Sequence, residues 1–564
     1  MRRPPARLLV PVAVVLLWLV LYPNLFILGE SVFGEDGFTL EHYRRFFASR
    51  SELEAAWNSV WISLGSVVLA GALGIPLAFL FGRRPFPGRT VLGALAALPV
   101  LLPPLVGVIA FLFLWGETGF LTRSIQFVLG LEEAPWRLSG AWAILLVHAY
   151  TMYVYFFLFT SAGLARLDSA YAEAGAALGA SRWTVLRRVT LPLLAPSIGG
   201  AALLVFMTSM ASFSAPYVFG GGFRVLTTQI FSSKLSGETA LVAVESVVLA
   251  SASLLFLFML YRFESARAYT GAGKGAGGGG SAGVAAGPRD ADGARSTWTR
   301  SSALRLTLAL ALVGFLLLPH LTLAVVSLVP AGTWTTELLP PAYTLDNYRN
   351  LFTRAELLRP VVNSFQMALL ATAANVVLAF GAAYLIERRR FRGRGAMAAL
   401  LILPWALPGT VLAIALATTF STNQWWAGRF LLVGTYAILP LAYFIRNIPL
   451  VTRAAQASFR QFDPALEEAA ASLGASWAHA MRRVAFPLVL PGLVAGALLA
   501  FVTALGEFVA SILLYTHRTR PISIEILSQL RGFDFGTAAA YGVLLVVLMA
   551  GVFMVGFRRV GAGL

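Results

Sequence analysis

The chain contains no cysteine among its 564 residues, which excludes disulfides, thiolate metal sites and cysteine nucleophiles. Charge is also scarce. Only 12% of the residues are Asp, Glu, Lys or Arg, whereas soluble globular chains carry about 25%. Hydrophobic residues make up 58% of the chain instead. This balance indicates a protein that crosses a membrane many times.

Signatures of catalysis and of nucleotide binding are missing too. The phosphate-binding pattern G-x-x-x-x-G-K-[ST] does not occur; the nearest string, around Lys274, has no Ser or Thr after its lysine. The histidines are scattered, and none pairs with another at ligand spacing: His42, His148, His320, His479 and His517. We therefore predict no catalytic residues, no metal ligands and no cofactor in this chain, and we do not expect an enzyme.

The apolar runs are long and do not alternate, so they predict transmembrane helices and not a membrane barrel. The expected fold is an all-α polytopic membrane protein with about twelve spans. They cover residues 8–29, 58–81, 91–116, 140–164, 192–219, 240–261, 303–329, 363–386, 396–420, 430–450, 487–515 and 536–557. The first run is too long for a signal peptide and lacks a cleavage site, so we interpret it as a retained span.

The net charge of +17 raises the question of nucleic-acid binding. With the N-terminus in the cytoplasm, however, the excess of Lys and Arg falls on cytoplasmic segments, while external segments carry balanced charge. This is the positive-inside rule, so the basicity reports topology and predicts contact with membrane lipids, not with nucleic acid. We expect both termini to be cytoplasmic.

The two halves of the chain repeat each other. Asn58-Ser59 matches Asn363-Ser364, and Pro99 and Pro103 match Pro404 and Pro408. A Gly/Ala-rich segment separates the halves and is typical of a flexible linker. We predict a first domain over 1–269, a cytoplasmic linker over 270–300 and a second domain over 301–564. Six spans in each half make the repeat parallel.

One repeated segment is moderately polar and lies between spans. Tyr171–Ile198 reads YAEAGAALGASRWTVLRRVTLPLLAPSI, and Leu466–Leu493 reads LEEAAASLGASWAHAMRRVAFPLVLPGL. A helix-forming run ends at a glycine, a serine can cap a second short helix, and a proline marks entry to the next span. Two short helices of this kind suit docking to a soluble partner. An amphipathic loop lying on anionic lipid is the competing interpretation.

The pattern E-A-A-x-x-x-G in this segment resembles the EAA loop of type I ABC importer permeases. The resemblance implies that these loops form coupling helices for cytoplasmic ATPase subunits. The docking residues would be Glu173, Ala174, Gly179, Glu468, Ala469 and Gly474. Gly175 stands where the pattern often has alanine, which could weaken that helix by about 0.5–1 kcal/mol.

The resemblance covers essentially the whole chain. Two permease domains fused in one chain are most similar to binding-protein-dependent ferric iron permeases, with thiamine permeases next. The implied protein is the permease subunit of an ATP-driven importer in the bacterial cytoplasmic (inner) membrane. Its implied partners are two ATPase subunits, which bind the ATP, and a periplasmic or lipid-anchored binding protein. Thiamine, polyamine, phosphonate or sulfate remain alternatives to ferric iron, and an ion-coupled secondary transporter is the alternative of a different class.

Ionisable residues inside spans are candidates for the translocation pathway, because a charge in the membrane is costly. Glu507 aligns with Ser212 of the first half, and a cationic substrate could use Glu507 as a stepping point. The alternative is a capped or snorkelling glutamate near the external end of its span. Glu245 is expected to be structural or interfacial. The prolines at 99, 103, 404 and 408 predict kinks in the third and ninth spans.

Overall fold

The fold is helical throughout, apart from one short hairpin, in a computed structural model that describes residues 6–34, 37–82, 86–268, 300–334, 337–421 and 430–561. The predicted linker, 270–300, lies outside the described residues except for Arg300. The chain divides into two compact units, which are described separately. The first comprises Met1–Leu53, Leu226–Ser251 and Val326–Leu564, and the second comprises Glu54–Val225 and Ala252–Val325.

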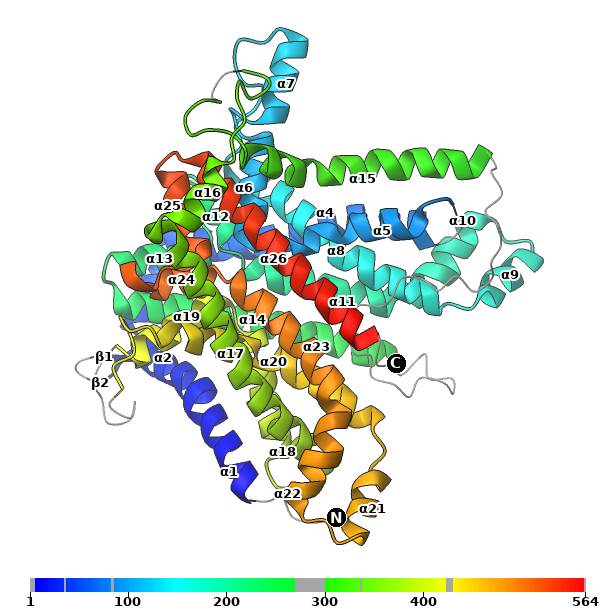
Figure 1. Cartoon of the computed structure of the whole chain (residues 1–564), viewed down its shortest axis with the longest axis vertical. Coiled ribbons are helices and arrows are strands. Elements are labelled where there is room, and N and C mark those ends of the chain that lie inside the picture. Colours follow the sequence, from blue (N-terminus) through cyan, green and yellow to red (C-terminus); the bar gives the residue numbers. More distant parts are fainter. Residues whose placement is uncertain are drawn as a thin grey trace. The chain divides into compact units, whose positions relative to one another are not determined.

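The first unit contains the N-terminal elements together with most of the second half of the chain (Figure 1). Its elements are α1 (Ala6–Val15), η1 (Leu16–Leu21), α2 (Tyr22–Val32), β1 (Phe33–Gly34), β2 (Gly37–Phe38), α3 (Glu41–Ala48), α13 (Leu226–Leu235), α16 (Asp346–Thr353), α17 (Ala355–Arg388), α18 (Arg394–Ala406), α19 (Gly409–Thr419), α20 (Ile438–Gln461), α21 (Ala465–Ser472), α22 (Trp477–Ala480), η5 (Met481–Ala485), α23 (Phe486–Leu505), α24 (Val509–Leu514), η6 (His517–Thr519), α25 (Ile522–Arg531) and α26 (Phe535–Gly561). The strands β1 and β2 pair antiparallel, with Phe33 opposite Phe38.

The second unit contains the corresponding elements of the first half. They are α5 (Arg89–Ala97), η2 (Leu98–Leu101), α6 (Pro104–Trp115), α7 (Phe120–Leu129), α8 (Gly140–Arg166), α9 (Ser169–Ala177), α10 (Arg182–Val185), η3 (Leu186–Thr190), α11 (Leu191–Met210) and α12 (Ser214–Phe219). Two long helices, α4 (Arg50–Gly82) and α14 (Thr239–Ala268), begin in the first unit and continue into the second. The helix α15 (Arg300–Val326) belongs almost entirely to the second unit.

The first helices of the two halves are therefore exchanged. In the first unit, α1 and α2 pack on α17 and α19, which come from the other half of the chain. In the second unit, the Tyr150 hydroxyl donates to the Leu316 carbonyl of α15, and Trp115 contacts Phe315 edge to face. Apolar side chains on these helices find partners more than a hundred residues away, so no local pattern predicts the exchange.

The core of each unit is a bundle of three spans. In the first unit, α17, α20 and α23 run side by side (Figure 1) and share a buried cluster that includes Tyr384, Phe459 and Val489. In the second unit, α4, α8 and α11 share Met152, Phe156 and Val205. Small residues let membrane helices approach closely. Gly74 illustrates this, because a Cβ there would collide with the Tyr153 carbonyl.

Among the described residues, ten helices are long and apolar enough to cross a membrane, or eleven if a bent pair counts as one span, against the twelve expected. The bent pair is α18 and α19, which meet at 107°, and this confirms the kink predicted for the ninth span. The third span breaks likewise near Pro99 and Pro103, and the stretch long enough to cross a membrane is Pro104–Leu129 and not the expected 91–116. The remaining expected span, 430–450, overlaps only the first part of α20, which begins at Ile438 and ends at Gln461. Polar residues such as Arg446 and Asn447 lower the hydropathy of this helix.

Candidate functional site

The first repeated segment forms a helix, α9, that ends in a Schellman motif. The Asp168 carboxylate begins it by accepting the Ala170 N–H at 3.0 Å. At the other end, Gly179 adopts φ +78°, its N–H donates to the Ala176 carbonyl at 2.9 Å, and the Ala180 N–H donates to the Gly175 carbonyl at 3.0 Å. Only glycine adopts this left-handed conformation readily, which explains the glycine of the pattern.

The second segment reproduces this geometry in α21. Gly474 has φ +81°, its N–H donates to the Ala471 carbonyl at 3.0 Å, and the Ala475 N–H donates to the Ala470 carbonyl at 3.0 Å. The Asp463 carboxylate accepts the Ala465 N–H at 2.9 Å. The two copies therefore share a backbone as well as a sequence, although they belong to different units.

A short second helix follows each glycine, as the sequence predicts. The hydroxyl of Ser181 accepts the Thr184 N–H at 3.2 Å, and that of Ser476 accepts the His479 N–H at 3.3 Å. These serines cap α10 and α22. Each helix then passes through one π-helical turn into a span whose first turn contains proline.

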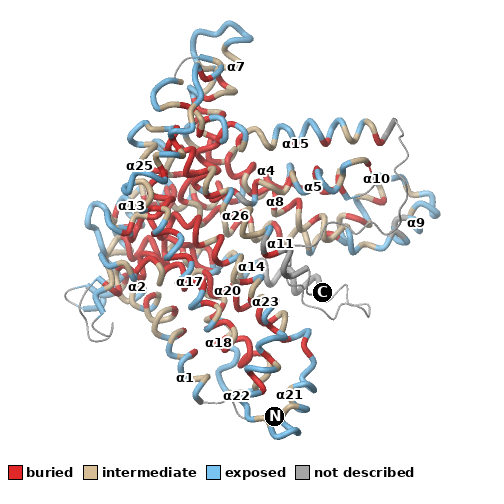
Figure 2. The backbone as a smooth tube through the Cα atoms, in the orientation of Figure 1, coloured by how far each residue is buried: buried red, intermediate tan, exposed pale blue. Residues whose placement is uncertain are grey.

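The predicted docking residues are exposed in both copies, and Figure 2 shows α9 and α21 largely in pale blue. Leu178 and Leu473, one residue before the two glycines, are both 89% exposed. A large apolar side chain is thus exposed at equivalent positions of the two copies. The repeat itself contains this leucine, but the E-A-A-x-x-x-G pattern does not mark it, and for that reason the sequence-based site omitted it.

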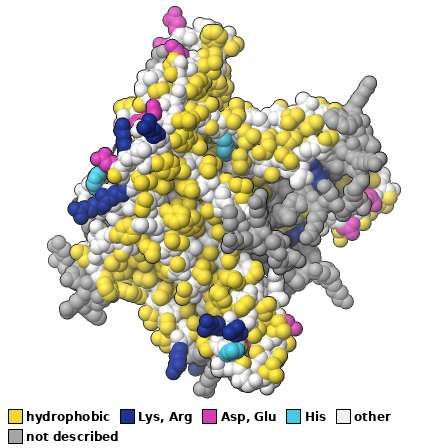
Figure 3. Space-filling model, viewed as in Figure 1, with side chains coloured by type: hydrophobic (Ala, Val, Ile, Leu, Met, Phe, Trp, Pro, Cys, Tyr) yellow, Lys and Arg dark blue, Asp and Glu magenta, His cyan; other side chains and the backbone are white. Residues whose placement is uncertain are grey.

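The end of the first unit that carries α21 and α22 is basic. Arg482, Arg483 and His479 are exposed there, and Figure 3 shows Lys/Arg and His side chains gathered over this end of an otherwise largely hydrophobic face. Such a distribution suits a cytoplasmic surface next to the bilayer.

The departure at Gly175 has a packing explanation. A Cβ at this position would lie 3.0 Å from Cγ2 of Val185, the buried residue of α10. The second copy has Ala470 and Ala480 at the two corresponding positions. A small residue thus faces a larger one in the first copy, and two alanines replace them in the second.

We expect Gly175→Ala alone to disturb the packing of α9 against α10 in the first repeated segment. The added methyl group overpacks against Val185, which costs about 1–3 kcal/mol and outweighs a gain in helix propensity of about 0.5–1 kcal/mol. The double variant Gly175→Ala, Val185→Ala reproduces the second copy and should restore transport. Rates of ATP-driven uptake measure both effects, and a double variant no better than the single one would contradict this explanation.

The second loop is tethered to α17 through Glu467, which has no counterpart in the first copy. The guanidinium Nε of Arg388, at the end of α17, lies 3.2 Å from Oε1 of Glu467, and Arg388 Nη2 donates to the Phe462 carbonyl at 2.6 Å. Burial raises the pKa of the Glu467 carboxyl, and Arg388 opposes that rise. The first copy has alanine at position 172, where the second has Glu467.

Glu507, a predicted pathway residue, is buried in the first unit with an arginine. Its Oε2 lies 2.8 Å from Nε of Arg446 on α20, and its Oε1 accepts the Ala510 N–H at 3.1 Å. Next to it, the Tyr443 and Ser511 hydroxyls are 2.7 Å apart. Glu507 is therefore paired with Arg446 and accepts an N–H from the first turn of α24; its part in transport stays a prediction.

Ser212, the other predicted pathway residue, belongs to a polar cluster in the second unit. Its hydroxyl lies 2.9 Å from Nε2 of the buried His148. Nδ1 of the same ring lies 2.9 Å from the Ser66 hydroxyl and 3.1 Å from that of Ser209. The sequence placed His148 within a span but did not associate it with Ser212. Across the described ranges, no group of three or more His, Cys, Asp or Glu is arranged to hold a metal.

Comparison with known proteins tests the resemblance. The chain matches the model of the family "Binding-protein-dependent transport system inner membrane component" twice, over residues 74–268 and 375–560. It is 28% identical, over 89% of its length and 86% of the relative's, to the probable ABC transporter permease protein y4fN of Sinorhizobium fredii.

Two further relatives have a transported substance in their names. The chain is 24% identical to the ferric transport system permease protein FbpB of Actinobacillus pleuropneumoniae, over 97% of this chain and 77% of the relative. It is 34% identical to the sulfate transport system permease protein CysT of Salmonella typhimurium, over 34% of this chain and 74% of the relative.

The family matches cover most of the chain and fall once in each half, as expected for two fused permease regions. Proteins of this kind are the membrane subunits of ABC importers and not enzymes, because a separate ATPase drives transport. The chain belongs to the family of binding-protein-dependent transport system inner membrane components and is a multi-pass ABC importer permease.

Proposed function

We propose that this permease imports ferric iron and binds one ATPase subunit at each of its two coupling loops. The observation that carries the docking proposal is the duplicated surface of α9 and α21. Both copies expose the glutamate and alanine of the pattern, both end in the same left-handed glycine, and both leave a leucine in solvent. One chain with domains 1–269 and 301–564 can thus bind a pair of ATPases.

The remaining assignments follow from the topology expected from the charge distribution. Both termini and both coupling loops lie in the cytoplasm, in keeping with the basic end that carries α21 and α22. ATP is bound by the partner subunits. A periplasmic or lipid-anchored binding protein delivers the substrate at the opposite side.

Ferric iron is favoured because a relative named for it aligns over 97% of this chain. Sulfate is the second candidate, since a relative named for it is more similar, at 34% identity, but only over 34% of this chain. The fused arrangement of two permease regions agrees with the ferric relative, whose match spans both halves.

The test is ATP-driven uptake by the full chain reconstituted in proteoliposomes with its ATPase subunits and its binding protein. We expect ⁵⁵Fe(III) to accumulate only when ATP is present on the side of the membrane where the ATPase subunits bind. We expect excess sulfate not to compete with iron for uptake. Sulfate accumulation without iron accumulation would assign the second candidate. Iron uptake driven by an ion gradient without ATP would point to a secondary transporter.

A further inference from the structure

A polar pocket opens in the first unit, at the end of its spans opposite α21. It has a volume of about 680 Å³, and its lining comes from α3, α13, the first turns of α4 and α14, and the short segments that join α3 to α4 and α13 to α14. Four serines and a glutamine line it together with His42, Arg45, Glu52 and Glu238. The helix α13 is fixed at this end because the Lys234 ammonium donates to the Leu513 carbonyl of α24, at 2.6 Å, and α24 follows the far end of span α23.

Two buried glutamates adjoin the pocket. Glu52 lines the pocket and is 4% exposed. Glu245 lies on α14, outside the lining, and is 0% exposed. Oε1 of Glu52 accepts the Gln229 amide N–H at 2.7 Å, and Oε1 of Glu245 accepts the Ser233 hydroxyl at 2.7 Å. The two carboxyl groups are also direct neighbours of each other.

Three oxygen atoms of this group have no donor. They are Oε2 of Glu52, Oε2 of Glu245 and Oε1 of Gln229, all of them buried. A buried acceptor without a partner costs free energy, and native interiors contain few of them. Three such atoms in one cluster therefore indicate a missing positive group.

No protein cation supplies that group among the residues that the structure describes. Neither glutamate forms a salt bridge there, and the charged groups that act on Glu245 are themselves acidic, Glu52 and Glu238. The nearby Lys234 is engaged with a backbone carbonyl. Two neighbouring buried carboxylates cannot both remain ionised unless a cation lies between them.

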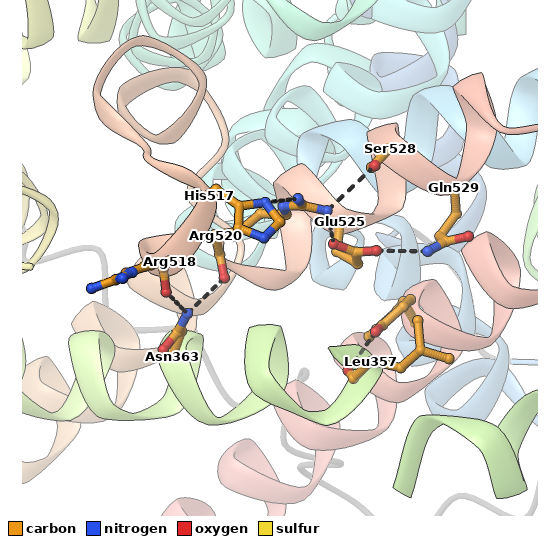
Figure 4. Close-up of polar contacts among 9 residues, drawn as sticks. Leu357, Asn363, His517, Arg518, Arg520, Glu525, Ser528 and Gln529 are labelled. Atoms are coloured by element: carbon orange, nitrogen blue, oxygen red, sulfur yellow. Dashed lines mark hydrogen bonds and ion pairs between the residues drawn. The ribbon is translucent and has the colours of Figure 1, made fainter. Parts of the chain in front are cut away.

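The second half has the same framework with its charge balanced (Figure 4). Glu525, the fourth residue of α25 as Gln229 is of α13, lies 2.7 Å from Arg520 and accepts the Gln529 amide at 2.6 Å. Tyr541 occupies on α26 the place of Glu245 on α14, and it donates to the carbonyl of Leu357, which stands where the first half has Glu52. The unbalanced acid pair is thus specific to the first half.

We propose that Glu52, Glu245 and Gln229 form a binding site for a hard metal cation that enters through the pocket. Carboxylate and amide oxygens are the ligands that such cations prefer, and the Ser233 hydroxyl and water can complete the coordination. The naming of ferric iron as the natural occupant rests on the proposed function; the cation site itself does not. The pocket lies at the end of the unit from which the binding protein would deliver its cargo.

The experiment measures Tb³⁺ binding, as a hard trivalent probe, by the full chain in phosphatidylcholine nanodiscs. We expect one site per chain that Ga³⁺ competes for and Na⁺ does not, and Tb³⁺ should raise the melting temperature. Glu52→Gln and Glu245→Gln should each weaken binding by about 10–100-fold or more, and the double variant should abolish it. Glu41→Gln, which removes an exposed carboxylate of α3, is the matched control and should leave binding unchanged.

The glutamine variants remove repulsion, so they should melt at or above the temperature of the metal-free wild type. Absence of a saturable Tb³⁺ site in the wild type would overturn the proposal and leave the pair sharing a proton. Equal loss in Glu41→Gln would also overturn it. Wild-type protein that binds Tb³⁺ but fails to transport iron would remove the proposed substrate while leaving the cation site intact.

Discussion

Reversing the charge of both coupling glutamates, with Glu173→Arg and Glu468→Arg, is expected to abolish ATP-driven transport while leaving the permease folded. Both side chains are exposed, and neither forms a contact that its helix needs. Charge reversal in a docked interface leaves unpaired or repelling charges and costs about 2–5 kcal/mol per site. Affinity for the ATPases should therefore fall by more than a hundredfold across the two sites. Co-purification of the ATPase subunits and ATP-driven uptake measure the effect.

In a matched control, the same change from glutamate to arginine is made at two other positions, at the other end of the spans. Glu41→Arg and Glu356→Arg also reverse exposed glutamates near helix starts, and they should keep the ATPases bound. Melting temperatures of all variants should agree within a few degrees, because exposed substitutions usually change stability by about 0.5 kcal/mol or less. Retained ATPase binding in the coupling variant would mean that α9 and α21 do not dock the motor.

The exposed leucines provide an independent check on the same surface. Leu178→Ala and Leu473→Ala remove apolar area without changing charge, so they should weaken docking regardless of ionic strength. The effect of the charge reversals, by contrast, should diminish as salt is added. If this surface merely lay on anionic lipid, the leucine variants would weaken membrane contact, the arginine variants would strengthen it, and neither set would change ATPase binding.

The coupling loops were predictable because their structure is determined locally. A glycine that ends one helix and a serine that caps the next act within a few residues of each other, and both predictions are confirmed at Gly179, Ser181, Gly474 and Ser476. The prolines do not separate the second helix from the span as expected, because α10, η3 and α11 follow one another without a break, and so do α22, η5 and α23. The kink of the ninth span followed from proline in the same way. The presence of glycine at position 175, where the pattern often has alanine, was explained only by the structure, which places Val185 opposite it.

Residues that depend on distant partners were not predictable. Glu507 meets Arg446 from another helix, and Glu245 meets Glu52 from the far end of the first half. Periodicity and composition carry no signal for such pairs, because the two members of each pair lie far apart in the chain. The sequence did place a span over 430–450, but it could not foresee that Arg446, which lowers the hydropathy of α20, pairs with Glu507.

Removing Arg446 is expected to be the most destabilising single change considered, because it leaves Glu507 buried without its cation. The Glu507 side chain is 6% exposed, and breaking a buried pair from one side costs about 3–5 kcal/mol. Arg446→Met keeps the length of the side chain and removes the charge, so the loss should appear as a lower melting temperature. Glu507→Gln should be milder, since Arg446 is 25% exposed and can reach water.

The double variant Arg446→Met, Glu507→Gln should recover most of the stability, because no buried charge remains. Gly409→Ala offers an independent route to the same defect: a Cβ at Gly409 would collide with the Arg446 guanidinium and displace it from Glu507. If the pair only holds α20 against α24, the double variant should regain transport together with stability. If Glu507 also carries a cationic substrate, stability should return and ATP-driven iron uptake should not, which separates the structural role of this glutamate from its role in the pathway.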